Sequence, residues 1–146
     1  MRVLLSLLLL LSACGGDGEP ALADVTFTTP LGAATIRAEV ARTQAEQARG
    51  LMLRDRLAQD RGMLFVFEGV APRRFFMKDT LIPLDLVSIR ARAVVAVQRM
   101  EPCTSDPCPI TTTPPADAAL EINAGRAEAL GVVSGATVSS SALPDQ

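Results

Sequence analysis

The sequence predicts a mainly β domain, either a β-sandwich or a small closed barrel, with two short helices. Several short apolar segments follow one another along the chain, and clusters of glycine, proline and polar residues separate them, as is typical of antiparallel β proteins. Two other stretches carry the start and stop residues of brief helices. The chain has 146 residues, which suits one domain and is too short for two ordinary ones.

Strands are expected where apolar residues alternate with polar ones or form short continuous runs. In one such segment Ile36, Ala38 and Val40 share a face and charged residues occupy the other. Residues 111–115 are expected to be extended and exposed. The predicted strands cover residues 25–28, 35–40, 63–67, 84–90, 93–100, 119–123 and 136–140.

Two short helices are expected between these strands. Thr43 and Glu46 have the spacing of a capping box, in which each side chain bonds to the other residue's backbone amide. A helix is therefore expected to begin directly after Thr43, and it cannot run far past Gly50. A second helix is expected over residues 124–130, where Gly131 ends it.

The N-terminus has the three-part layout of a secretory signal. Arg2 supplies a positive charge, residues 3–11 an apolar stretch, and Ala13 a small residue before the predicted cleavage point. The apolar stretch is far shorter than the roughly 20 residues that cross a bilayer. The sequence therefore predicts an exported protein without a transmembrane anchor.

The residues around the predicted cleavage point, Leu11 to Cys14, resemble the lipobox of bacterial lipoproteins, in which the cut falls directly before the cysteine. The resemblance implies a diacylglycerol on the Cys14 sulfur, with the membrane as partner through this lipid; the alternative is an ordinary signal peptide. No aspartate stands directly after Cys14, which by resemblance to lipoprotein sorting favours the periplasmic face of the outer membrane. The expected organisation is a signal peptide (1–13), a lipidated flexible tether (14–24), a β domain (25–141) and a C-terminal tail (142–146).

Composition excludes several functional classes. The formal net charge is -2, from 14 basic and 16 acidic residues, so there is no basic excess for contacts with nucleic acid phosphates. The chain has no histidine, which excludes Ser-His-Asp and Cys-His catalysis and histidine metal sites. We therefore expect no nucleic acid partner, no metal and no cofactor.

Cys103 and Cys108 lie in a proline-rich loop and are expected to form a disulfide in an exported protein. So short a closed loop contributes only about 2 kcal/mol, so the bond is expected to fix the loop rather than to hold the domain together. The spacing differs from the Cys-x-x-Cys redox motif. Two thiolates could also bind zinc, but no histidine is present to complete such a site.

Four sequence blocks resemble, in order and spacing, the uncharacterised family called domain of unknown function 192 (DUF192). They are RGLMLR (49–54), GMLFVF (62–67), FFMKDTLIPLD (75–85) and LEINAG (120–125). The resemblance covers roughly residues 25–138 and includes the cysteine loop. It implies a compact, mainly β fold of sandwich or jelly-roll type and no established activity. Family members usually have tryptophan at the position of Phe76 and asparagine at that of Asp79, so a ligand that contacts the tryptophan would be bound differently here.

Polar side chains occur within these otherwise apolar blocks, where charges are costly unless they are paired or line a cleft. One interpretation is a buried structural network, in which Arg49 or Arg54 pairs with Asp85 or Glu121. The other is a ligand pocket, in which Arg54 and Lys78 hold a small polar or anionic ligand and Asp85 accepts hydrogen bonds. The candidate residues are Arg49, Arg54, Lys78, Asp79, Asp85, Glu121 and Asn123.

A third interpretation is catalytic, with Asp85 and Glu121 as the carboxylate pair of a small hydrolase. A purely structural accessory lipoprotein is a further alternative. We favour a lipid-anchored, non-catalytic β domain of the cell envelope that binds a ligand or partner. Whether they form a network or a pocket, the polar groups are expected to converge, with Asp85 within about 10 Å of Arg49 or Arg54. Gly50, Gly62 and Gly125 are expected in turns or helix caps.

Overall fold

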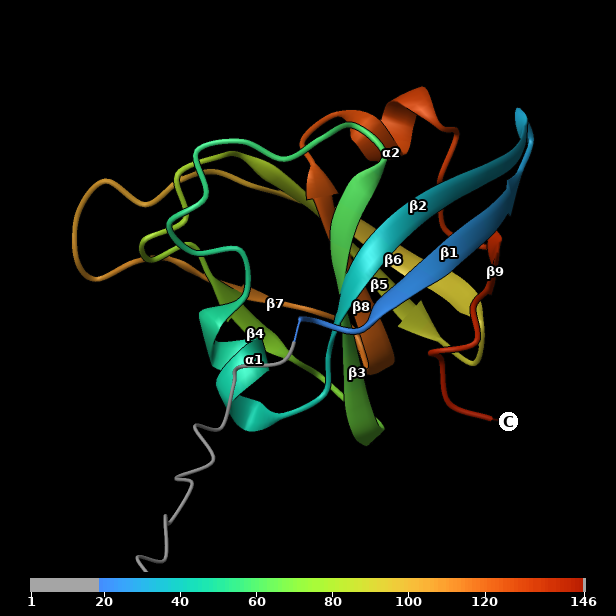
Figure 1. The fold of residues 1–146 in the computed structure, drawn as a ribbon, viewed down its shortest axis with the longest axis horizontal. Coiled ribbons are helices and arrows are strands. Elements are labelled where there is room, and N and C mark those ends of the chain that lie inside the picture. Colours follow the sequence, from blue (N-terminus) through green and yellow to red (C-terminus); the bar gives the residue numbers. More distant parts are fainter. Residues whose placement is uncertain (1–18, 146) are drawn as a thin grey trace, which may run out of the picture.

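Seven strands close into a barrel in the computed structural model, which describes residues 19–145 (Figure 1). Their order around the barrel is β1-β2-β3-β8-β5-β6-β9, and β9 pairs with β1 to complete the circle. The β2/β3 pair is parallel and the other pairs are antiparallel. The barrel strands are β1 (Leu22–Thr29), β2 (Gly32–Ala41), β3 (Arg61–Ala71), β5 (Leu84–Arg90), β6 (Ala93–Met100), β8 (Ala116–Asn123) and β9 (Thr137–Ser139).

The closed-barrel form of the predicted fold is thus confirmed, in place of the sandwich or jelly roll. Strands β5 and β6 have the predicted bounds, and their hairpin turns at Ala91 and Arg92, which both have positive φ, 49° and 56°. Two consecutive residues of this kind match the twist of a two-residue hairpin. Closure leaves no long unpaired strand edge in this sheet.

The barrel interior contains the main hydrophobic core. Strand residues such as Phe27, Leu64, Val87 and Leu120 fill it and are fully buried. The short helix α2 (Arg126–Ala129) and the turn after it add Ala127, Val132 and Ala136 to the same core. In Figure 1 this segment lies across the top of the barrel.

A second layer packs against the outside of β3, β5 and β8. It consists of helix α1 (Gln44–Arg49) and a two-stranded sheet of β4 (Arg74–Phe76) and β7 (Ile110–Thr112), which lie together beside the barrel in Figure 1. Leu51, Phe75 and Met77 of this layer share a hydrophobic cluster with Phe65 and Leu86 of the barrel. Strands β3, β5 and β8 are therefore buried on both faces, which explains their nearly continuous apolar sequences.

The predicted capping box is confirmed at the start of α1. The Thr43 hydroxyl accepts from the Glu46 amide at 3.2 Å, and a Glu46 carboxylate oxygen accepts from the Thr43 amide at 2.8 Å. Because these hydrogen bonds satisfy amides that the first turn leaves free, a helix of only six residues is defined at its N-terminus.

Several predictions differ from the structure. The pairing of β4 with β7 was not predicted: residues 111–115 are not simply extended, since Thr111 and Thr112 pair with Phe75 and Arg74. Gly62 lies within β3 rather than in a turn. The strand needs glycine at this position because a Cβ would come within 2.6 Å of the Glu121 carbonyl oxygen. The folded unit is also longer than residues 25–141, since β1 begins at Leu22 and Leu143 is buried.

The disulfide between Cys103 and Cys108 is present, as predicted. The predicted signal peptide and the predicted lipid attachment residue Cys14 lie outside the described residues. Within residues 19–145, no helix is both long enough and apolar enough to span a bilayer.

Candidate functional site: an aromatic pocket over Glu121

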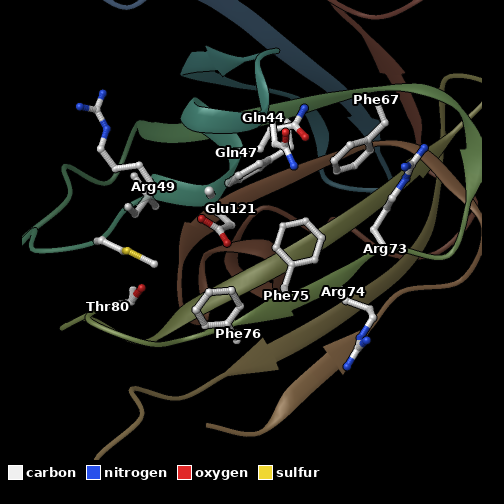
Figure 2. Close-up of a pocket in the computed structure, with 15 residues that line it drawn as sticks. Gln44, Gln47, Arg49, Phe67, Arg73, Arg74, Phe75, Phe76, Thr80 and Glu121 are labelled. Atoms are coloured by element: carbon white, nitrogen blue, oxygen red, sulfur yellow. The ribbon is translucent and has the colours of Figure 1, made fainter. Parts of the chain in front are cut away.

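A pocket of about 310 Å³ opens between helix α1, the loop after it, and strands β3, β4 and β8. Its walls are the outer layer and the outer face of β3 and β8, so the sheet itself separates it from the barrel interior. Figure 2 shows Phe67, Phe75, Phe76 and Glu121 gathered around a common space. The lining residues are Gln44, Gln47, Ala48, Arg49, Gly50, Leu51, Met52, Phe65, Phe67, Arg73, Arg74, Phe75, Phe76, Thr80 and Glu121.

Four phenylalanines give the pocket its apolar character. Phe65 and Phe67 are two residues apart on β3, so both point to the outer face. Phe75 from β4 packs edge-on against both, with ring centroids 5.3 Å from Phe65 and 6.4 Å from Phe67. Phe76 lies at the mouth and is 43% exposed, whereas Phe75 and Met77 are buried.

Glu121 supplies the carboxyl group of the pocket. It pairs across the sheet with Met63 on β3 and Leu86 on β5, and its side chain therefore points to the outer face with theirs. Figure 2 shows its carboxyl group directed between Phe75, Phe76 and Thr80.

The Glu121 side chain is only 6% exposed. Among the described residues, its carboxyl group forms no ion pair and accepts no side-chain or backbone hydrogen bond. Burial alone raises its pKa from 4.5 to about 8, because removing a carboxylate from water disfavours the charged form. The group is therefore mostly protonated at neutral pH.

Gly50 brings the α1 loop close to this carboxyl group. Its φ of 48° and ψ of -135° place it in a region that side chains rarely adopt. A Cβ at this position would lie 3.5 Å from Phe65 Cζ and 3.9 Å from Glu121 Oε2. Gly50 is thus a helix-end glycine, as predicted, and it also lets the backbone form one wall of the pocket.

Gln47 fixes α1 against the barrel. Its Nε2 donates to the carbonyl of Val66 on β3 at 2.9 Å and lies within 3.4 Å of the Ala41 carbonyl and 3.3 Å of the Arg42 carbonyl. An exposed six-residue helix is not stable by itself. These hydrogen bonds and the packing of Leu51 hold it in place as a pocket wall.

Three arginines surround the pocket. The Arg73 guanidinium lies over the Phe67 ring, 4.3 Å from its centroid, and donates to the carbonyls of Glu68 and Gly69. Figure 2 shows the guanidinium groups of Arg49 and Arg74 directed away from Glu121, at the periphery. The cations are therefore arranged around the mouth, and the buried carboxyl group lies further in.

The predicted pairing of Arg54 with Asp85 or Glu121 is wrong. Arg54 forms a two-pronged ion pair with Glu39 on β2, with both N–O distances at 2.6 Å. The hydrogen bonds from Arg54 lower the pKa of Glu39, and those to Glu39 raise the pKa of Arg54. Both side chains are partly exposed, so this pair joins the 50–60 loop to the barrel outside the pocket.

Asp85 also has a different partner from the predicted arginines. Its Oδ2 accepts a hydrogen bond of 3.0 Å from the amide of Ala127, in the first turn of α2. Asp85 pairs with Ile122, the neighbour of Glu121 on β8, so Asp85 and Glu121 point to opposite faces of the sheet. A carboxylate pair sharing one substrate, as the hydrolase alternative required, is excluded by this geometry.

The other predicted residues have local roles. Asn123 Nδ2 donates to the carbonyls of Leu57 and Ala58 and so holds the loop before β3. Lys78 Nζ is 3.7 Å from Asp106, and both side chains are exposed. Asp79 has a φ of 54°, a conformation that aspartate and asparagine tolerate better than most residues, and its carbonyl accepts from the Leu53 amide.

Of the seven candidate residues, only Arg49 and Glu121 line the pocket. The aromatic wall residues were not predicted as site residues, although Phe65 and Phe67 stand two apart in the predicted strand over residues 63–67. No group of three or more histidine, cysteine, aspartate or glutamate residues in the described part of the chain could hold a metal ion.

The fold and the pocket define a small closed β-barrel domain with an aromatic pocket on its outer layer. The chain belongs to the DUF192 family, whose model, described as Uncharacterized ACR, matches residues 26–140. This result confirms the resemblance found in the four sequence blocks.

Two solved structures are similar to the whole domain. A protein of Sinorhizobium meliloti 1021, described as a "putative transcription regulator", has a TM-score of 0.80 and 30% sequence identity over 88% of this chain and 100% of that chain. A protein of unknown function from Novosphingobium aromaticivorans DSM 12444 has a TM-score of 0.74 and 33% identity over 84% of this chain and 94% of that chain. No curated protein matches the sequence.

Proposed function

We propose that this protein is a non-catalytic domain that binds a small, largely apolar molecule in the pocket over Glu121. The observation that carries the proposal is the buried carboxyl group without a protein partner, directed into a space walled by phenylalanines. Burying a polar group without a hydrogen bond is costly. A ligand that bonds to Glu121 and covers the rings would remove this cost.

The lining favours binding over catalysis. Glu121 is the only carboxylate among the lining residues, and the other polar side chains are glutamine, threonine and arginine. Glycoside hydrolysis by carboxyl groups uses two of them on one substrate. Aromatic and aliphatic walls with one or two oriented polar groups are typical of small-molecule binding sites.

The charge of this chain does not support a role in transcription like the one in the description of the S. meliloti protein. A regulator that binds DNA needs a surplus of basic residues for phosphate contacts. This chain instead has 16 acidic and 14 basic residues, so its charge favours a small ligand over nucleic acid.

Binding can be tested with the fluorescent probe 1-anilinonaphthalene-8-sulfonate, which has an apolar aromatic body. We expect saturable binding that Phe76→Ala weakens at least fivefold. Ile110→Ala is the matched control, because Ile110 pairs with Phe76 on the small sheet and is similarly exposed but does not line the pocket. Equal affinities of the two variants for the probe would argue against the pocket as the binding site.

We further propose that the domain is held at the membrane by a lipid on Cys14. The described chain begins at Glu19, and the Ala21 carbonyl accepts from the amide of Val40 near the end of β2, which leads into α1. Five extended residues span about 18 Å at most. A lipid on Cys14 would therefore keep the pocket elements within reach of the bilayer surface.

The lipid anchor is tested separately from the pocket. A fatty-acid probe fed to expressing cells should label the wild-type protein and not Cys14→Ser. Equal labelling of the two proteins would refute lipidation at Cys14 and would leave the pocket proposal unaffected.

A further inference from the structure

We infer that the ligand of this pocket presents an ammonium group to the Glu121 carboxylate and lays its apolar part against the phenylalanines. The inference rests on the proposed function and specifies its ligand class as organic amines or quaternary ammonium compounds. It follows from the geometry of the carboxyl group, from the nature of the walls and from the position of the arginines.

The walls favour a cation at the inner end of the pocket. The face of an aromatic ring is negative, so it attracts ammonium and guanidinium groups and repels carboxylates. One wall ring already binds a cation in this way, since the Arg73 guanidinium lies 4.3 Å from the centroid of Phe67. Phe75 and Phe76 remain available beside Glu121.

Glu121 favours the same class of ligand. A carboxylate buried among apolar side chains is stabilised most by a partner of opposite charge that also donates to it or contacts it closely. No cation of the described chain takes this role, because the guanidinium groups of Arg49 and Arg74 point away from it and Arg73 is held over Phe67. The ligand can supply the missing charge.

The arginines restrict where the ligand can be charged. They surround the mouth, so a second positive charge on the outer part of the ligand would be repelled there. An ammonium group is therefore expected at the inner end, and the outer end is expected to be neutral or anionic.

This arrangement makes binding dependent on pH. The charged groups that face the pocket are Arg49 from α1, Arg73 and Arg74 at β4, and Glu121 from β8. Arginine stays charged throughout the accessible range, so Glu121 is the group that titrates, with a pKa raised by burial to about 8. An ammonium ligand needs the carboxylate, and its affinity should rise as the pH rises through 8.

The test uses benzyltrimethylammonium, whose charge does not depend on pH, and the neutral compound benzyl alcohol. Phe76→Trp supplies a fluorescent reporter at the mouth, because the chain contains no tryptophan. In this background we expect benzyltrimethylammonium to bind at least tenfold more tightly at pH 9 than at pH 6. Benzyl alcohol should bind equally at both pH values.

Adding Glu121→Gln to the reporter protein should weaken benzyltrimethylammonium binding at pH 9 at least tenfold and remove its pH dependence. Glu68→Gln is the matched control, since Glu68 is exposed and does not line the pocket. If benzyl alcohol binds but benzyltrimethylammonium does not, or if Glu121→Gln does not change benzyltrimethylammonium affinity, the inferred ligand class is wrong. The proposed binding function of the pocket would still stand. If neither compound changes the fluorescence, both this inference and the proposed function fail.

Discussion

Glu121 lies in a strand that has no solvent-facing side. Its neighbours Leu120 and Ile122 fill the barrel interior, and its own face is covered by the outer layer. Such a position normally holds an apolar residue. A carboxyl group there lowers stability whenever it is charged, so its presence is best explained by a ligand.

The raised pKa of Glu121 predicts an unusual dependence of stability on pH. The folded protein, with a pKa of about 8, holds the proton more tightly than the unfolded chain, with a pKa near 4.5. The contribution of the bound proton to stability is therefore complete below pH 4.5 and is lost as the pH rises through 8. Between pH 6 and 9 the wild-type free energy of unfolding should fall by roughly 3 kcal/mol.

Urea unfolding at several pH values checks this prediction. The Glu121→Gln variant should show a nearly flat profile over the same range, because it has no proton to lose. Glu68→Gln should keep the wild-type slope. A flat wild-type profile would show that Glu121 is solvated and ionised, contrary to the structure.

The sequence alone located Glu121 but not the partners of the other charged residues. Glu39 lies on the polar side of β2, and in the sequence such a side is typical of residues that face solvent. The sequence pattern therefore did not indicate that Glu39 is the partner of Arg54. Asp85 bonds to a backbone amide, and side-chain patterns carry no information about such partners. Distances between segments far apart in the chain depend on the register of the barrel.

Among the elements, β5 and α2 are connected by the buried Asp85. Its carboxylate accepts from Ala127, whose amide would otherwise be free in the first turn of α2. Asp85→Ala should therefore lower the free energy of unfolding by about 1–2 kcal/mol. Asp85→Asn keeps an acceptor oxygen and should cost less.

Neither change at Asp85 should alter binding of 1-anilinonaphthalene-8-sulfonate, because Asp85 does not line the pocket. Urea unfolding measures the stability of both variants. A loss of several kcal/mol in Asp85→Asn would indicate a stranded buried cation, as the predicted arginine pair required, and would contradict the capping role.

The disulfide loop connects β6 to β7 and closes over only a few residues. The chain-entropy model gives such a loop about 2 kcal/mol. Replacing both Cys103 and Cys108 with serine should lower stability by that amount and leave the circular dichroism spectrum of the native state unchanged. Loss of the folded state in this variant would show that the bond holds more than the loop.

The elements were predicted with uneven success for a physical reason. Long strands such as β5 and β6 carry enough periodic residues to be recognised from their own sequence. Strands β4 and β7 have three residues each and exist because they pair with each other across more than 30 residues of chain. That pairing depends on the barrel on which the two strands pack, so no local sequence pattern predicts it.

In the molecule as a whole, the barrel contributes most of the hydrophobic core, and the outer layer forms the pocket proposed to bind a ligand. The barrel interior holds the larger hydrophobic cluster, and the buried carboxylate of Asp85 on the same face bonds to the Ala127 amide. The outer layer adds a smaller cluster and leaves a pocket beside it. Closed sheets are rigid supports, and sites on rigid supports keep their geometry.

The structure also contains a hollow at another place on the barrel, lined by Arg37, Arg92 and Ser139 among others. Its walls are more polar, and it contains no aromatic ring. Because it shares no lining residue with the pocket over Glu121, probe binding there can be told apart from binding over Glu121.

The most direct test is a nitrogen–proton correlation spectrum of the whole protein, recorded while benzyltrimethylammonium is added at pH 9. The amide shifts should change together at residues 49–52, 65–67, 74–76, 80 and 121, which belong to five separate segments that meet only at the pocket. Residues around Arg37 and Ser139 should be unaffected. Changes centred on that second hollow, or scattered over the surface without saturation, would contradict the assignment of the pocket over Glu121 as the binding site.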